Sequence, residues 1–462
     1  MASVINQSNE NSSLVATLQE AEEAIVSPFS YSLEKMYPFH ATQLLEIPPD
    51  NAGNIGAGKS NDFSLPKFGM VRSLVLSFLH KNGGTVVKSC RTGLLNAIDR
   101  IEILSSSRRL AVLDKYSLMA AISDKTADVR MNYYKGCHMS SAGDQMDGAT
   151  ALTYRSYISL PFSFFDNIKN ALMTSFVEPV TVRVHYSDLK YQMVSTTVTA
   201  ATLSDARIYA DYKVLTPQDE DASIEENFGG GVLTQLNYDY HTESAVTGDL
   251  ANDAELTLRK EITDTGVCSD VYVIVMAHLA NNTANSEAKL LACEVPLKLD
   301  KIQFEASGQN IIPLVDADLI EFWGRRSETS NMYSCGYSSA INPSDDPAQF
   351  RWVYKLQLGL SDDKRFSSGG VSLRELSAPT ITAHVRRAGA SDDNSSTSGT
   401  EQTGSSGGAD QADTSSAANR FVSDQNESIL NGFKVSMHVV LRKHVLTATE
   451  PQSGRITTAL SS

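Results

Sequence analysis

Short stretches in which apolar and polar side chains alternate dominate this chain, and this period of two constrains the fold more than any other feature. Such alternation is typical of β-strands that turn one face to a core and the other to water or to a partner. No long helical pattern separates the stretches, which argues against parallel βαβ folds and favours antiparallel sandwiches or barrels. The clearest examples are residues 74–78, 180–187, 208–215, 352–360 and 433–439.

The length and the composition along the chain predict two domains. A chain of 462 residues is too long for one hydrophobic core. Residues 216–233 are acidic and then glycine-rich, as in a linker between two β-rich halves. The domains are therefore expected at residues 67–215 and 234–462. Residues 387–424 carry almost no large apolar side chain, and a strand pattern follows them, so we expect a flexible polar loop inserted between strands.

Residues 1–66 are expected to form an N-terminal arm. Leu14, Leu18, Ala21 and Ile25 share one face of a predicted short helix at residues 13–26. Prolines follow at positions 28, 38, 48, 49 and 66, and they predict an extended or irregular stretch. The helix could pack on its own domain or reach a neighbouring subunit, and the sequence leaves both alternatives open.

A weak internal repeat relates the two halves. Residues 99–103 (DRIEI) resemble residues 300–304 (DKIQF) at an offset of 201. At the same offset Leu113 matches Leu314, and Leu118 matches Leu319. Self-similarity at a fixed offset indicates two copies of one structural plan.

Charge and cysteine usage narrow the functional classes. The formal net charge is -15, and the first fifty residues contain Lys35 as their single basic residue. An acidic surface repels phosphate backbones, so we expect no direct binding of nucleic acid. The five cysteines are far apart and form no C-x-x-C pair, which favours free thiols. They are Cys90, Cys137, Cys268, Cys293 and Cys335.

One motif suggests nucleotide chemistry, but its context does not support it. Residues 53–60, with Gly53, Gly58, Lys59 and Ser60, satisfy the pattern G-x-x-x-x-G-K-[ST]. A phosphate-binding loop needs a buried strand before it and a helix after it. Prolines precede the motif and the residues after it cannot form a useful helix, so we interpret the match as chance. The histidines show no metal-ligand grouping. We therefore predict no catalytic residue, no cofactor and no metal.

Several ordered motifs resemble the double jelly-roll major capsid proteins of nucleocytoplasmic large DNA viruses and of related tailless icosahedral viruses. Residues 157–166 (YISLPFSFFD) and 178–186 (EPVTVRVHY) are similar to the family's "PLPFWF" strand and the strand after it. Residues 96–103 and 206–220 resemble its earlier strand and the strand that closes its first barrel. In the second half, residues 353–360, Ser368-Gly369 and the ending with Gly454 resemble "YSFAL…PSG" and "LRI…G…L".

The resemblance covers roughly residues 70–462 and has departures. The family's proline before Ser-Gly is Ser367 here, and its later Asn and Arg fall on Ser372 and Glu375. The Cys-Arg pair that usually follows the "FWF" strand is absent.

The resemblance implies an all-β fold of two tandem eight-stranded antiparallel jelly-roll barrels with an N-terminal arm. It implies a major capsid protein, not an enzyme, whose homotrimers form pseudo-hexagonal capsomers that tile an icosahedral shell. The implied partners are neighbouring capsomers, minor capsid or penton proteins, and an internal membrane layer. The implied location is the virion, after synthesis in the host cytoplasm. The alternative is a β-sandwich attachment protein, lectin-like, or a minor capsid protein.

Overall fold

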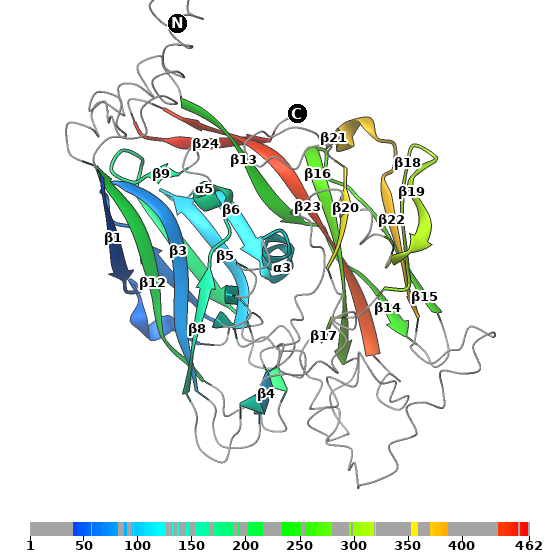
Figure 1. Ribbon diagram of the computed structural model, residues 1–462, viewed down its shortest axis with the longest axis horizontal. Helices are drawn as coiled ribbons and strands as arrows, with labels where there is room; N and C mark the ends of the chain where they lie inside the picture. The colour runs from blue at the N-terminus through cyan, green and yellow to red at the C-terminus, as the bar shows by residue number, and fades with distance from the viewer. Residues whose placement is uncertain are drawn as a thin grey trace, which may run out of the picture.

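The computed structural model contains two β-rich halves, which we call the first half (residues 40–215) and the second half (residues 233–460) (Figure 1). No helix in the described part of the chain is long and apolar enough to cross a membrane. The structure describes residues 40–56, 58–81, 87–89, 95, 97–106, 108–125, 129, 132–133, 136–137, 145–146, 153–166, 171–187, 193–194, 202–215, 233–250, 255–279, 295–296, 299–317, 319, 353–358, 370–386, 433–450 and 453–460.

The first half is built on two antiparallel sheets. Sheet 1A has the strand order β1-β12-β3-β8, and sheet 1B has the order β2-β10-β5-β6. Counted along the chain, consecutive strands lie in different sheets, except for β5 and β6, which are neighbours in sheet 1B; this is the order of a jelly roll. Their bounds are β1 (His40–Ile47), β2 (Ser60–Ser64), β3 (Met70–Lys81), β5 (Ile98–Ser105), β6 (Arg108–Asp114), β8 (Thr153–Ser159), β10 (Val180–Tyr186) and β12 (Thr202–Leu215).

Short elements complete the first half. Helix α3 (Lys115–Ser123) follows β6, and α5 (Ser163–Asp166) follows β8. The 3-10 turn η1 (Ala52–Asn54) lies between β1 and β2, and β9 (Leu172–Met173) pairs with β3. A small separate sheet is formed by β4 (Val87–Ser89), β7 (Gln145–Met146) and β11 (Met193–Val194).

The second half repeats this plan. Sheet 2A has the order β14-β23-β16-β20, and sheet 2B has the order β15-β22-β18-β19. The same jelly-roll alternation results, so each half contains one such barrel. The bounds are β14 (Val246–Leu250), β15 (Glu255–Glu261), β16 (Val267–Leu279), β18 (Lys301–Ala306), β19 (Gln309–Asp316), β20 (Val353–Gln357), β22 (Thr380–Arg386) and β23 (Phe433–Thr449).

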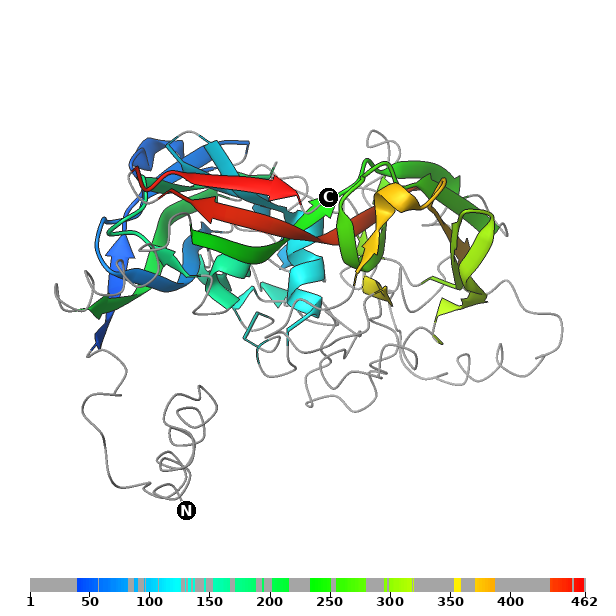
Figure 2. The same ribbon diagram turned by 90° about the horizontal axis from the view of Figure 1, so that it is seen from above.

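Further strands extend sheet 2A. β13 (Leu233–Thr242) and β24 (Ile456–Leu460) pair with the C-terminal part of β23, while β17 (Val295–Pro296) and β21 (Val371–Ser372) pair with β16. The turn η7 (Leu373–Glu375) follows β21. β23 runs from the second half across the first, and β13 and β24 accompany it there (Figures 1 and 2).

The predicted alternation is realised most clearly in β10. Val180, Val182, Val184 and Tyr186 are buried, and the residues between them are half-buried. Strands β20 and β23 differ, because most of their residues are buried on both faces. The reason is that the outer face of sheet 2A packs against the first half and does not meet water.

The N-terminal arm predicted at residues 1–66 is too long, because part of it belongs to the first jelly roll. Residues 40–47 form β1, which pairs with β12, and residues 60–64 form β2, which pairs with β10. Both strands therefore belong to the first jelly roll. The prolines at 48 and 49 lie between the strands, where no ladder hydrogen bond is needed.

The internal repeat falls on topologically equivalent strands. Residues 99–103 lie on β5 and residues 300–304 lie around the start of β18, each the second strand from the edge of its sheet. On the strands that follow, β6 and β19, the offset of 201 residues is wrong by one residue. Leu113 pairs with Ile101, whereas Val315 and not Leu314 pairs with Ile302. An irregularity in the β18–β19 register accounts for the shift.

Several predicted features lie outside the described residues: the helix at 13–26, nearly all of the linker at 216–233, and the loop at 387–424. Two of the five cysteines are described. Cys137 and Cys268 are free and buried, and burial raises the pKa of both thiols.

Candidate functional site at the junction of the two halves

Helix α3 lies at the centre of the contact between the halves (Figure 1). It begins where β6 ends, because the Asp114 side chain accepts a hydrogen bond from the Ser117 N–H (2.7 Å) and caps the first turn. Nearly every residue of the helix is buried. A helix buried all round must have partners on several sides. Its partners are β5 and β6 of the first half and β13, β20 and β23 of the second half.

Apolar side chains of the second half join the core of the first. On β16, Tyr272, Ile274 and Met276 belong to the same buried cluster as the first-half side chains. Val271, Val273 and Val275, which alternate with them, belong to the second-half core. One strand thus contributes to two cores, and the area it buries on both faces stabilises the junction.

A buried ionic network crosses the junction beside this apolar contact. Lys355 on β20 donates to Asp124 Oδ1 at the end of α3 (2.7 Å), and its ammonium lies 3.4 Å from Asp270 Oδ1 on β16. Arg442 Nη1 on β23 lies 3.2 Å from Asp124 Oδ2 and 3.3 Å from Asp270 Oδ2. The Tyr240 hydroxyl also donates to Asp124 (3.1 Å). Two carboxylates and two cations therefore form a compact neutral group.

The electrostatics of the network favour the charged forms of Asp124, Lys355 and Arg442. Burial alone would raise the pKa of Asp124, but the charges of Lys355 and Arg442 outweigh it and hold that pKa well below its usual range. Burial alone would lower the pKa of Lys355, and Asp124 and Asp270 reverse that effect and raise it. The mutual dependence means that removing one member leaves uncompensated charge in a buried site.

Aromatic rings surround the network. The guanidinium of Arg442 lies 4.2 Å from the ring centroid of Tyr238, within the range of a cation–π contact. Tyr240 packs edge-on against Tyr238 and tilted against Tyr272. These rings exclude water from the ion pairs, which strengthens the attraction between the charges.

The C-terminal strands form a second contact with the first half. Gly454 O accepts a hydrogen bond from Glu178 N (2.9 Å), and Ile456 is 1% exposed within the first-half core. Glu178 also pairs with Arg108 of β6 (3.6 Å). β24, near the C-terminus, thus packs on the half that contains β1. The predicted boundary at residue 234 therefore does not separate two independent cores.

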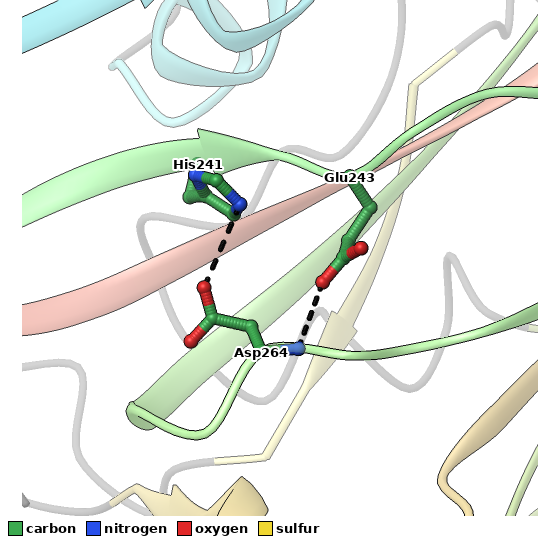
Figure 3. Close-up of side chains that lie close together, drawn as sticks. All are labelled: His241, Glu243 and Asp264. Carbon is green, nitrogen blue, oxygen red and sulfur yellow. Dashed lines mark hydrogen bonds and ion pairs between the residues drawn. The ribbon is translucent and has the colours of Figure 1, made fainter.

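A smaller polar cluster lies beside the junction, where His241, Glu243 and Asp264 converge (Figure 3). His241 Nε2 is 3.6 Å from Asp264 Oδ2, and the Asp264 N–H donates to Glu243 (3.0 Å). Lys443 donates to Asp264 (2.5 Å), and Lys260 lies 3.6 Å from Glu243. Two lysines thus already neutralise both carboxylates. We interpret the cluster as a group of contacts that stabilises the bend after β15, not as a cation site.

The structure places the candidate phosphate-loop residues at the surface between β1 and β2. Gly53 lies in η1, Gly58 and Lys59 are exposed, and Ser60 begins strand β2 where a phosphate loop would begin a helix. Backbone N–H groups that would cradle a phosphate are already engaged. Gly58 N donates to Tyr186 O (3.1 Å), and Lys59 N donates to Gly56 O (3.1 Å).

Replacing Lys59 with alanine is therefore expected to change the free energy of unfolding by no more than about 0.5 kcal/mol, because the side chain is exposed. The mass of the assembled protein should also stay the same, as measured by light scattering. Nucleotide hydrolysis should be at background in both proteins. A measurable ATPase activity that disappears in the variant would contradict this interpretation.

No pattern in the sequence indicates the junction network. Lys355 lies between Tyr354 and Leu356 in a strand whose alternation predicts that lysine on a solvent face. Its partner Asp124 is 231 residues away. Charged residues at alternate positions of a strand are normal for an exposed face. Only the arrangement of the two halves therefore distinguishes Lys355 from a solvated lysine.

Comparisons with known proteins agree with the architecture. No protein-family model matches the sequence, and no curated protein is significantly similar in sequence. Solved structures do match. VP54 of PBCV-1, in a structure fitted into a reconstruction of the virophage Sputnik, has a TM-score of 0.63 at 12% identity over 94% of this chain and 100% of that one. The Faustovirus major capsid protein has a TM-score of 0.57 at 10% identity, covering 100% and 98%.

A third match is the mavirus major capsid protein, with a TM-score of 0.53 at 10% identity, covering 95% of this chain and 94% of that one. At these identities the likeness concerns the fold. It extends over nearly the whole length of both chains, so it includes both jelly rolls and the way they adjoin. The prediction of an all-β, double jelly-roll fold is confirmed.

Proposed function

We propose, from the double jelly-roll fold that this chain shares with viral major capsid proteins, that it is the major capsid protein of an icosahedral virus. The observation that carries the proposal is the match over 94% of this chain and all of the PBCV-1 protein, with both barrels in the same chain. A match to one barrel would fit many β-sandwich proteins, because one fold supports unrelated functions. Two barrels joined in one defined way are much more restrictive.

The junction supports this function physically. A shell subunit must keep its two lobes at a fixed angle, since both make contacts with neighbours. The strand β16 that serves two cores and the Asp124–Lys355–Arg442–Asp270 network fix this angle. Interfaces between independent domains usually permit the domains to move relative to each other, unless the interface is large and hydrophobic.

The assembly we propose is a homotrimer that forms a pseudo-hexagonal capsomer and contacts neighbouring capsomers. Minor capsid or penton proteins and an internal membrane layer are its further proposed partners. The net charge of -15 favours a shell that does not touch nucleic acid directly. We propose residues 1–39 as an arm toward neighbours and residues 387–424 as a surface loop. We assign no enzymatic activity, and we place the protein in the virion after synthesis in the host cytoplasm.

The purified full chain is expected to be a trimer of three 50.1 kDa chains, about 150 kDa by light scattering. Electron micrographs of it should show particles with six lobes. A monomer near 50.1 kDa at concentrations of tens of micromolar would contradict the proposal. It would favour the alternative of a β-sandwich attachment protein, lectin-like, or a minor capsid protein.

A further inference from the structure

Lys443 and Asp264 form a contact with almost no access to water. Lys443 lies on β23, which crosses both halves, and Asp264 lies in the bend between β15 and β16. Lys443 Nζ is 2.5 Å from Asp264 Oδ2, and the two side chains are 6% and 11% exposed. An ion pair on the surface is hydrated and loosely held. In this pair an amine and a carboxyl group are instead kept together in a buried site.

The bend is built around the Asp264 carboxylate. Asp264 Oδ1 accepts a hydrogen bond from Gly266 N (2.9 Å), and the Asp264 N–H donates to Glu243 (3.0 Å). His241 Nε2 lies 3.6 Å from Oδ2, the oxygen that faces Lys443 (Figure 3). A Cβ added at Gly266 would lie 3.1 Å from Lys443 Cδ and 3.3 Å from Asp264 Oδ1. Glycine therefore leaves the room that both side chains use.

A third group, Asp239, can move protons between the two partners. Asp239 on β13 is paired directly with Lys443 on β23. Side chains of directly opposite residues share one face of a sheet, with Cβ atoms about 4.5–5.5 Å apart. Burial raises the pKa of Asp239 to about 7, although the charge of Lys443 acts against it. Near neutral pH this carboxyl group therefore both accepts and releases a proton.

The resting contact is an ion pair. Burial alone would raise the pKa of Asp264, but the hydrogen bonds from Lys443 and from the Gly266 N–H outweigh it and lower that pKa. Two charges held away from water carry a large desolvation cost. Conversion of the pair into a neutral amide removes both charges. The fixed position of the amine also replaces a bimolecular encounter, which corresponds to effective concentrations of about 10⁵ M or more in well-oriented groups.

We propose that Lys443 Nζ and Asp264 Cγ condense to an amide, an isopeptide bond within one chain that ties β23 to the bend after β15. The Lys443 ammonium gives one proton to Asp239, and the lone pair freed on Nζ attacks Cγ. Asp239 passes this proton to the Asp264 oxygen that leaves, and a second proton from Nζ completes a water molecule. One C–N bond forms, one C–O bond breaks, and the third proton stays on the amide nitrogen. Nothing is oxidised or reduced.

Two other buried lysine–carboxylate pairs among the described residues lack this arrangement. Lys355 lies 2.7 Å from Asp124, but the neighbouring carboxylate, Asp270, is itself held between Lys355 and Arg442. Lys260 lies 3.6 Å from Glu243, and it donates to the Ser244 hydroxyl instead (2.7 Å). The Lys443–Asp264 pair combines the short distance with a nearby carboxyl group that titrates near neutral pH.

The mass of the denatured full-length chain tests the proposal. Intact-protein mass spectrometry should find the folded wild-type chain lighter than its sequence by one water molecule. Protease digestion should then give a branched peptide that joins the segments containing Asp264 and Lys443. A wild-type chain at its full sequence mass would overturn the proposal, and so would a loss of water that maps to any other pair. The bond needs no neighbouring copy, so neither result bears on the proposed capsid function.

Two matched lysine variants separate the bond from the ion pair. Lys443→Arg keeps the positive charge but lacks the amine, so its mass should equal its sequence mass. The control, Lys260→Arg, changes the neighbouring cation and should still lose one water molecule. In a denaturing gel the wild-type chain should migrate differently from Lys443→Arg, because the bond closes residues 264–443 into a loop that survives unfolding. Identical migration would contradict the bond.

Asp239→Asn tests the route of the proton. It keeps both reacting groups but cannot carry a proton, so the rate of bond formation after synthesis should fall by about a hundredfold. Asp239→Glu restores the carboxyl group and should recover the bond, and circular dichroism checks that both variants fold. Bond formation at the wild-type rate in Asp239→Asn would overturn the role of Asp239.

Discussion

Replacing Asp124 with asparagine is expected to lower the free energy of unfolding by about 3 kcal/mol, because two cations then share a single buried carboxylate. Lys355 and Arg442 keep Asp270 as a partner, at 3.4 and 3.3 Å, which places the effect near the lower end of the usual range for a broken buried ion pair. The measurement is the midpoint of guanidinium unfolding at a fixed protein concentration, since association also stabilises the chain.

The control for this variant is Asp99→Asn, which removes an exposed ion pair with Arg100. Asp99 and Arg100 are 54% and 46% exposed, so the expected change is below about 1 kcal/mol. Equal effects of Asp99→Asn and Asp124→Asn would show that the junction network contributes no more than a surface pair.

The pH dependence of the Asp124 effect has a defined sign. The folded-state pKa of Asp124 lies below its unfolded value of 3.8, so the unfolded state binds more protons between the two values. The stabilisation is complete above pH 3.8 and is lost as the pH falls toward the folded-state pKa. The difference between the wild-type protein and Asp124→Asn should therefore be largest near neutral pH and smaller in acid.

The sequence predicts strands well where one face is buried and the other is not. β10 shows this pattern, and its apolar positions all face the core. β1 lacks it, because five of its first seven residues are exposed and Leu44 is the most exposed large apolar side chain described. Only Leu45 and Ile47 of this edge strand contact the core, so the strand has little periodic signal, and the sequence therefore places residues 40–47 in the expected N-terminal arm.

At the junction the sequence pattern is wrong in the opposite sense, because it predicts exposure for side chains that are buried. A lysine between apolar residues of a strand predicts a solvent face, and Lys355 follows that pattern. Arg442 begins a basic run with Lys443 and His444, which is also typical of an exposed face. Their partner Asp124 ends a helix in the other half. Nothing local distinguishes a charge paired across a junction from a solvated charge, so the network could be found only from the arrangement of the two barrels.

The second large effect is expected at Gly454, where alanine should lower the free energy of unfolding by about 3 kcal/mol or more. Gly454 has φ +63°, a region that side chains with a Cβ rarely adopt. An added Cβ would also collide with the backbone carbonyl oxygen of Phe176 and press on Val177. The neighbour is backbone, so it cannot rotate away as a flexible side chain would.

Gly308→Ala separates the two contributions at Gly454. Gly308 lies in the turn between β18 and β19 with φ +71°, but a Cβ there would meet no atom within 4 Å. Its substitution should therefore cost only the backbone strain, about 1 kcal/mol. The excess cost at Gly454 measures how closely the C-terminal strands approach the first half.

The location of the amides that exchange faster in Gly454→Ala tests whether lost docking of the C-terminal strands causes the destabilisation. Gly454→Ala should weaken the Glu178 N to Gly454 O hydrogen bond (2.9 Å) and loosen Ile456 from the first-half core. Amides of β24 and of residues 176–178 should then exchange faster with solvent, while those of sheet 2B should not change. Uniform acceleration across both halves would indicate global destabilisation without a local loss of docking. The predicted pattern would instead show that β24 helps to hold the two barrels in one rigid block, as the proposed function in a shell requires.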